Sequence, residues 1–176
     1  MMKAPLLLPG DLLMNRITGN VLIAGHEISP DTIELMFRTA SFTGLFSAYL
    51  ERHFQRYGLS QPGFMLLLLL HTQSEETWTA ARLADTLGVR APTMTGILDT
   101  LQKQGFIERQ PSQHDRRKNS IVLTSTGRKK LKRILPDHFR RIQAAFGRLA
   151  TPEFRESCQA VFLQLEAAAT ELAGNN

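Results

Sequence analysis

The sequence is almost free of cysteine. Cys158 is the single cysteine in 176 residues, which excludes an internal disulfide framework and a structural zinc site made of cysteine thiolates. The chain also lacks a phosphate-binding glycine loop, a metal-ligand spacing, and a Ser/His/Asp or Cys/His order that survives placement on helices. We therefore expect no enzyme, no cofactor and no metal site, and the scarcity of cysteine suits the reducing cytoplasm.

Long apolar runs are missing as well. The longest, residues 64–70, is far shorter than the roughly 20 residues that cross a bilayer. The segment before Gly10 has one lysine and three consecutive leucines between Pro5 and Pro9, whereas a signal peptide needs about 7–15 apolar residues and a cleavage site. We predict a soluble, cytoplasmic protein with no membrane partner.

Positive charge is concentrated in one part of the chain. There are 21 basic and 16 acidic residues, a net charge of +5. The segment from Lys103 to Arg133 has ten basic residues against Glu108 and Asp115, a charge of +8, so the remainder carries −3. Such a segment is typical of a phosphate-binding surface, although a solvated charged face together with a helix end gives the same charges.

The hydrophobic pattern divides the chain into four regions. Residues 1–30 contain several prolines and glycines and form an N-terminal arm. Residues 31–72 are predicted to be helical, because Ser29-Pro30-Asp31 is a helix start and apolar residues then recur at helical spacing. Residues 73–125 contain two short helices and two strands, and residues 126–176 form C-terminal helices.

Residues 79–103 are predicted to form two short helices joined by a tight turn. Thr79 is a suitable N-cap, apolar residues follow at i, i+3, i+4 and i+7, and Gly88 ends the first helix. Pro92 suits the first turn of the second helix, which Gly105 terminates. This arrangement is a helix-turn-helix. Opposite the apolar stripe, the second helix carries Pro92, Thr93, Gly96, Asp99, Thr100 and Lys103, with Thr95 at the edge.

The hydrophobic period then changes from that of a helix to that of a strand. Residues 106–110 and 120–124 are predicted to pair as a hairpin. The connection, residues 111–119, is polar, basic and too long for a two-residue turn. A hairpin with a protruding tip directly after a helix-turn-helix is a wing.

Residues 78–135 resemble the winged-helix module of the MarR family of bacterial transcription regulators. The features that carry the resemblance are Leu83-Ala84, Thr93 and Thr95, Leu101 with Gly105, Phe106-Ile107-Glu108-Arg109, Asp115-Arg116-Arg117, and Leu123-Thr124 with Gly127. The resemblance implies a mainly helical fold with a small β-hairpin wing, namely a winged helix-turn-helix DNA-binding lobe over residues 73–125 plus a helical dimerisation region. The expected partner is double-stranded DNA, which places the protein at the nucleoid.

Residues 92–103 are the candidate DNA-reading helix, because a major groove about 12 Å wide admits one α-helix. Thr93 and Thr95 near its start can reach base edges or phosphates, and Gly96 would let the backbone approach closely. Asp99 would repel phosphate, so we expect it to pair with a base donor or an arginine. The candidate DNA contacts in this part of the chain are Arg90, Pro92, Thr93, Thr95, Gly96 and Lys103. A solvent-facing helix without a DNA role remains the alternative.

The predicted wing adds four candidate DNA contacts. The resemblance marks Arg117 as the minor-groove residue, and a guanidinium suits a narrow, strongly negative A·T groove. Asp115 would hold Arg117 in place. Arg116 and Lys118 would then contact the DNA backbone with less specificity.

The resemblance further implies a homodimer and a small effector. We assign dimerisation to the arm, to residues 31–72 and to residues 126–176, with Leu12, Phe162, Leu165 and Leu172 as candidates; packing within one chain would explain these residues equally well. Members of the family are commonly repressors released by small amphipathic or aromatic ligands. The candidate pocket residues are Phe46, His53, Phe54, Trp78 and Arg82, for which core packing is the competing explanation.

The function predicted from the sequence is that of a homodimeric, sequence-specific repressor that reads a palindromic operator and is released by a ligand. A ligand-independent regulator that competes with nucleoid proteins is the alternative. A protein-interaction module without a DNA role would show no salt-dependent affinity for any duplex, unlike a DNA binder.

Overall fold

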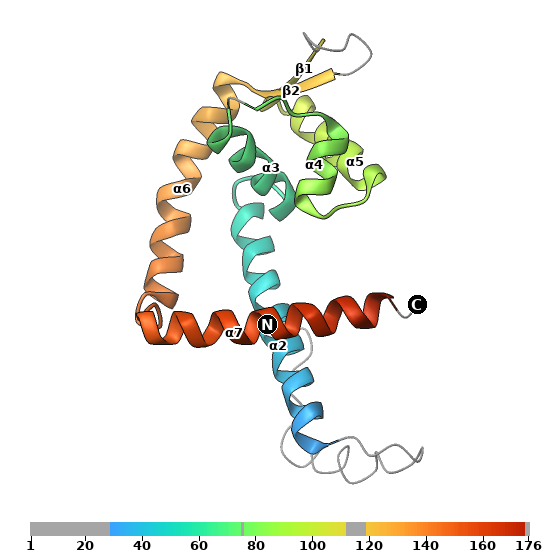
Figure 1. Cartoon of the computed structure of the whole chain (residues 1–176). Coiled ribbons are helices and arrows are strands. Elements are labelled where there is room, and N and C mark those ends of the chain that lie inside the picture. The colour runs from blue at the N-terminus through green and yellow to red at the C-terminus, as the bar shows by residue number, and fades with distance from the viewer. Residues whose placement is uncertain (1–28, 75, 112–118, 175–176) are drawn as a thin grey trace. The chain divides into compact units, whose positions relative to one another are not determined.

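The structure is a computed structural model that describes residues 29–74, 76–111 and 119–174. It is mainly helical with one antiparallel hairpin, and the elements follow one another as α2 (Pro30–Gln55), α3 (Gln61–Thr72), α4 (Ala80–Leu87), α5 (Ala91–Lys103), β1 (Ile107–Pro111), β2 (Asn119–Leu123), α6 (Ser125–Phe146) and α7 (Pro152–Gly174) (Figure 1). The fold class predicted from the sequence is confirmed. The chain divides into two compact units, Met1–Thr124 and Ser125–Asn176.

The first unit begins with α2 and α3. The Ser29 hydroxyl accepts a hydrogen bond from the Asp31 amide at 3.2 Å and so starts α2. Ser60 starts α3 in the same way by accepting from the Gly63 amide. The two helices meet where the Phe54 and Phe64 rings stack with centroids 4.1 Å apart. The apolar run of α3 is buried on most sides, and only Met65 in it is exposed.

Helices α4 and α5 form the predicted helix-turn-helix. The Thr79 hydroxyl accepts from the Arg82 amide, and Gly88 ends α4 at a φ of 62°, in the left-handed region that favours glycine. Pro92 lies in the first turn of α5, as its fixed φ allows. The buried side of the pair contains Leu83, Ala84, Met94, Leu98 and Leu101.

The hairpin is held against this core at its base. Ile107 pairs with Leu123 and Arg109 with Ile121. Each strand lies one residue nearer the loop than the sequence predicted. The Ile121 amide donates to the Trp78 carbonyl at 2.7 Å, and the Thr124 hydroxyl donates to the Gly105 carbonyl at 2.7 Å. These bonds fix where the wing leaves the lobe.

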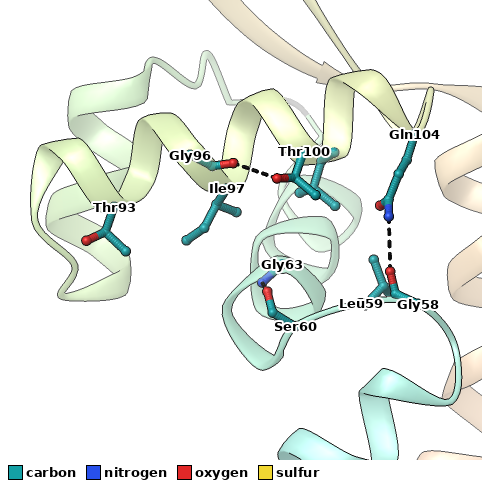
Figure 2. A pocket seen from close by; sticks show the side chains of 10 residues that line it. Gly58, Leu59, Ser60, Gly63, Thr93, Gly96, Ile97, Thr100 and Gln104 are labelled. Atoms are coloured by element: carbon teal, nitrogen blue, oxygen red, sulfur yellow. Dashed lines mark hydrogen bonds between the residues drawn. The ribbon is translucent and has the colours of Figure 1, made fainter.

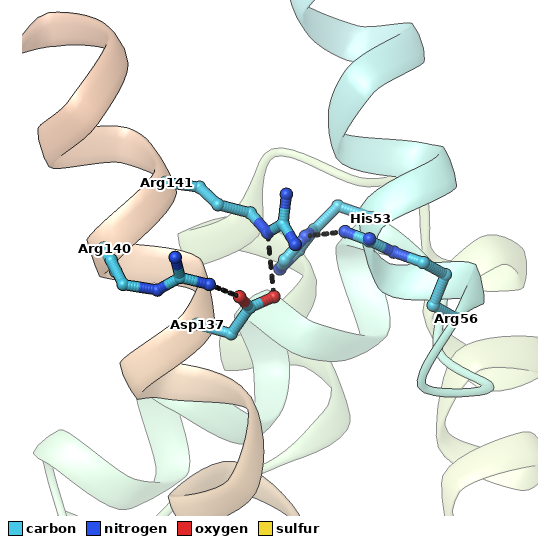
Figure 3. Close-up of polar contacts among 5 residues, drawn as sticks. All are labelled: His53, Arg56, Asp137, Arg140 and Arg141. Carbon is cyan, nitrogen blue, oxygen red and sulfur yellow. Dashed lines mark hydrogen bonds and ion pairs between the residues drawn. The ribbon is translucent and has the colours of Figure 1, made fainter.

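The second unit consists of α6 and α7. Helix α6 continues through Pro136, and Asp137 on it accepts hydrogen bonds from Arg140 at 2.6 Å and Arg141 at 2.9 Å (Figure 3). Burial lowers the pKa of His138 against the opposite effect of Asp137. Helix α7 contains no buried residue. In the part of the chain that the structure describes, no helix has the length and hydropathy needed to span a membrane.

Candidate nucleic-acid interface

Helix α5 turns its polar side to solvent. Met94, Leu98 and Leu101 fasten the helix to the core, and all three are buried. The opposite side presents an exposed ridge made of Pro92, Gly96, Asp99 and Lys103, with Arg90 exposed just before the helix. The residues predicted to face DNA are therefore accessible.

A cleft lies along each flank of this ridge. The first, of about 340 Å³, separates α5 from the turn before α3, and its α5 wall includes Thr93, Gly96 and Thr100 (Figure 2). Gln104 closes one end by donating to the Gly58 carbonyl at 3.1 Å. The second cleft, of about 460 Å³, is lined by Thr79, Ala80, Ala81, Thr95, Leu98, Arg109 and Ile121. The ridge stands between two hollows, a shape that a groove of DNA can accept.

The threonines of α5 differ in what their hydroxyls already do. Thr95 donates to the Ala91 carbonyl at 3.1 Å and Thr100 to the Gly96 carbonyl at 2.8 Å. Their oxygens keep acceptor capacity, but their protons are used within the helix. Thr93 is exposed, and among the described residues its hydroxyl makes no such bond, so it can still donate to a base or phosphate.

Gly96 has no structural requirement to be glycine. It lies inside a helix, and a Cβ built on it would meet nothing within 4 Å. Glycine costs a helix interior roughly 0.5–1 kcal/mol relative to alanine. An open position with this cost suits a surface that another molecule approaches closely.

Asp99 pairs with Arg109, one of the partner types expected from the sequence. The Arg109 Nη2 atom lies 2.6 Å from Asp99 Oδ1, so the pair joins α5 to β1. Arg109 itself was not among the candidate DNA contacts, because nothing local in the sequence shows that a strand residue reaches the helix before it.

The basic residues continue into the second unit at the start of α6. Arg128, Lys129, Lys132 and Arg133 are exposed. Lys130 is half-buried, and burial together with the positive charge of Arg133 lowers its pKa.

The wing tip, with Asp115, Arg116, Arg117 and Lys118, lies outside the described residues. Within the described ranges no group of His, Cys, Asp and Glu side chains could hold a metal ion.

Comparison with known proteins identifies the lobe. A model of the MarR family matches residues 59–118. The HTH-type transcriptional repressor YetL of Bacillus subtilis is 33% identical over 118 residues, 67% of this chain and 71% of the relative. The chain belongs to the MarR family. It is a transcription regulator with a DNA-binding winged helix-turn-helix, and not an enzyme.

Other relatives of this MarR-family chain agree. The transcriptional repressor MprA of Escherichia coli is 32% identical over 96 residues, 54% of each chain. The crystal structure of Sco3205, a MarR family regulator from Streptomyces coelicolor in complex with DNA, superimposes with a TM-score of 0.73 at 20% identity, covering 81% of this chain and 90% of that one. At that identity the likeness supports the fold.

The predicted effector residues of this MarR-family protein fall into two groups. On α2 the rings follow one another, from Phe46 through Tyr49 to His53 with centroids 6.3 and 5.7 Å apart, and His53 meets Phe54 at 5.1 Å. Arg56 donates to His53 Nδ1 (Figure 3). Tyr49 was not among the pocket residues predicted from the sequence. Its hydroxyl is buried and has no hydrogen-bond partner among the described residues.

The second group lies next to α4. The Arg82 guanidinium stacks 4.5 Å over the Trp78 ring and pairs with Glu76 at 2.8 Å. Trp78 is buried, and its indole N–H donates to the Gln73 carbonyl at 3.2 Å. The contacts with Glu76 and Gln73 connect Arg82 and Trp78 to the segment between α3 and α4. An effector role for these residues stays a prediction.

The predicted dimer residues of the second unit are accessible. Phe162 is 50% and Leu172 73% exposed, and Leu165 is half-buried. A dimer role for these residues stays a prediction. Leu12 lies outside the described residues. Helix α2 has further exposed apolar residues, namely Leu35, Met36, Phe42 and Leu45.

Proposed function

We propose that this MarR-family regulator is a homodimeric repressor that reads a palindromic operator on chromosomal DNA. The observation that carries the proposal is the exposed polar ridge of α5, which is fastened to the core by its buried side and followed directly by a wing. A single winged-helix module contacts little DNA. Such modules usually bind as two-fold dimers, in which each protomer contacts one half-site of the operator. Genomic footprinting with the purified protein would identify the operators and the genes they control.

Loss of Arg117 should weaken operator binding while leaving the fold intact. The variant Arg117→Ala is expected to lose about 1–3 kcal/mol of binding free energy, because a guanidinium in a narrow groove contributes to specificity as well as charge. Fluorescence anisotropy at fixed salt measures the change. The matched control is Arg116→Ala, which removes the same charge from the same loop and should weaken all duplexes about equally. Equal effects of the two variants on the operator would contradict the wing assignment.

We propose further that a small amphipathic or aromatic ligand releases the repressor by binding at the α2 rings. Tyr49 supports this, since a buried hydroxyl without a partner costs about 1–3 kcal/mol and a ligand acceptor would remove that cost. Phenolic acids such as salicylate and cationic amphiphiles should raise the melting temperature and release DNA. Tyr49→Phe should keep or raise the melting temperature without ligand and reduce the response to it. Compounds that neither bind nor release DNA would favour a regulator that simply competes with nucleoid proteins.

A further inference from the structure

Asp99 is an acidic residue on a surface that is proposed to meet phosphates. Its side chain is 58% exposed, and it lies on the α5 ridge with Gly96 and Lys103. A carboxylate at this place repels DNA unless a positive charge compensates it. Arg109 supplies that charge at 2.6 Å, from an element that follows α5 in the chain.

Stability alone does not account for this ion pair. Arg109 is 30% exposed, and ion pairs between side chains this accessible contribute about 0–1 kcal/mol to folding. Because the pair contributes little to folding, we look for its role in the two elements that it joins, α5 and β1.

The position of Arg109 in the hairpin is specific. It pairs with Ile121, and it lies on the same side of the strand as Ile107, two residues earlier. Ile107 and Ile121 are buried, whereas the neighbouring Glu108 on the other side is exposed. Arg109 therefore leaves the hairpin from its core-facing side, at the edge of the cleft that Thr95 and Leu98 of α5 also line.

We propose that Asp99 is a positioning residue for DNA recognition, acting through Arg109. The carboxylate holds the guanidinium at the junction of α5 and β1, so the reading helix and the wing meet the duplex in one fixed relation. A guanidinium has five N–H donors, and the hydrogen bond to Asp99 uses a single nitrogen, which leaves donors for a DNA phosphate. The inference rests on the proposed operator binding and names one of its specificity-determining pairs.

The sign of one substitution tests the proposal. Asp99→Asn removes a negative charge from the DNA-facing surface, so simple electrostatics predicts tighter binding to every duplex. We expect operator affinity to fall about tenfold instead, within the range of couplings between contacting residues, while affinity for unrelated DNA stays equal or rises. Glu108→Gln is the matched control: it removes the same charge one residue from Arg109, on the other side of the hairpin, and should not lower operator affinity.

A double variant checks that the two residues act as a unit. Arg109→Gln should lower operator affinity, and Asp99→Asn added to it should cost little more. Melting temperatures of all variants separate a folding defect from a recognition defect, since an exposed pair should shift them little. Unchanged or tighter operator binding by Asp99→Asn, or losses that simply add in the double variant, would overturn the positioning role. A wild-type protein without salt-dependent, sequence-specific binding would instead refute the proposed function itself.

Discussion

A chain carrying Phe162→Glu and Leu172→Glu is expected to sediment as a monomer at micromolar concentration and to lose operator affinity about 100-fold or more. Both side chains are at least half exposed on α7, a helix without a buried residue. Two charges on an apolar face that associates with another chain would have to be desolvated. A monomer then loses the effective concentration with which one bound module presents the second, a gain of about 10²–10⁴.

The control for this variant uses the other side of the same helix. Ala160 and Ala167 are exposed, and at 100° per residue each lies at least 120° from both Phe162 and Leu172. Ala160→Glu with Ala167→Glu adds the same two charges, and therefore the same repulsion from DNA, away from the face that carries Phe162 and Leu172. Analytical ultracentrifugation should show this chain as a dimer. A dimer in both cases would place the contact elsewhere, for example on the exposed apolar residues of α2, and monomers in both would indicate that charge alone dissociates it.

Elements whose boundaries are set by local chemistry could be predicted closely from the sequence. Thr79, Gly88 and Pro92 each act through their own backbone or side chain within a turn: Thr79 starts α4, Gly88 ends it, and Pro92 lies in the first turn of α5. The hairpin was also found, with each strand lying one residue nearer the loop than predicted. The strand ends are decided by pairing across the strands and by the anchor between Ile121 and Trp78, and neither is a local property.

Contacts between elements were harder to predict. Periodicity places Asp99 on the exposed side of α5, but it does not say that Arg109 crosses from the strand to reach it. The same limit applies to α2, where apolar residues occur around more of the helix than one stripe. Their spacing is helical whether they face a core or a partner, so exposed Phe42 and buried Phe54 look alike in the sequence.

The substitution Gly96→Leu should make the protein more stable and its DNA binding much weaker. Replacing glycine in a helix interior with a good helix former is expected to add about 0.5–1 kcal/mol to the free energy of unfolding. The first atom of the new side chain meets nothing in the protein within 4 Å, so the fold should accept it. A leucine on the ridge holds α5 away from the groove, and the loss of more than one base contact, each about 1–3 kcal/mol, should lower operator affinity by about 2–4 kcal/mol.

The matched control is Gln102→Leu, which adds the same side chain to an exposed position on the same helix. At 100° per residue Gln102 lies about 120° away from Gly96 and off the ridge, so operator affinity should change little. Denaturant titration and anisotropy on the two variants give both quantities. If Gly96→Leu alone combines a gain in stability with a loss of operator affinity, glycine at this position serves the close approach of α5 to DNA and not the fold. If both variants bind the operator like the wild type, the ridge of α5 does not enter the groove, and the basic wing would have to account for recognition without it.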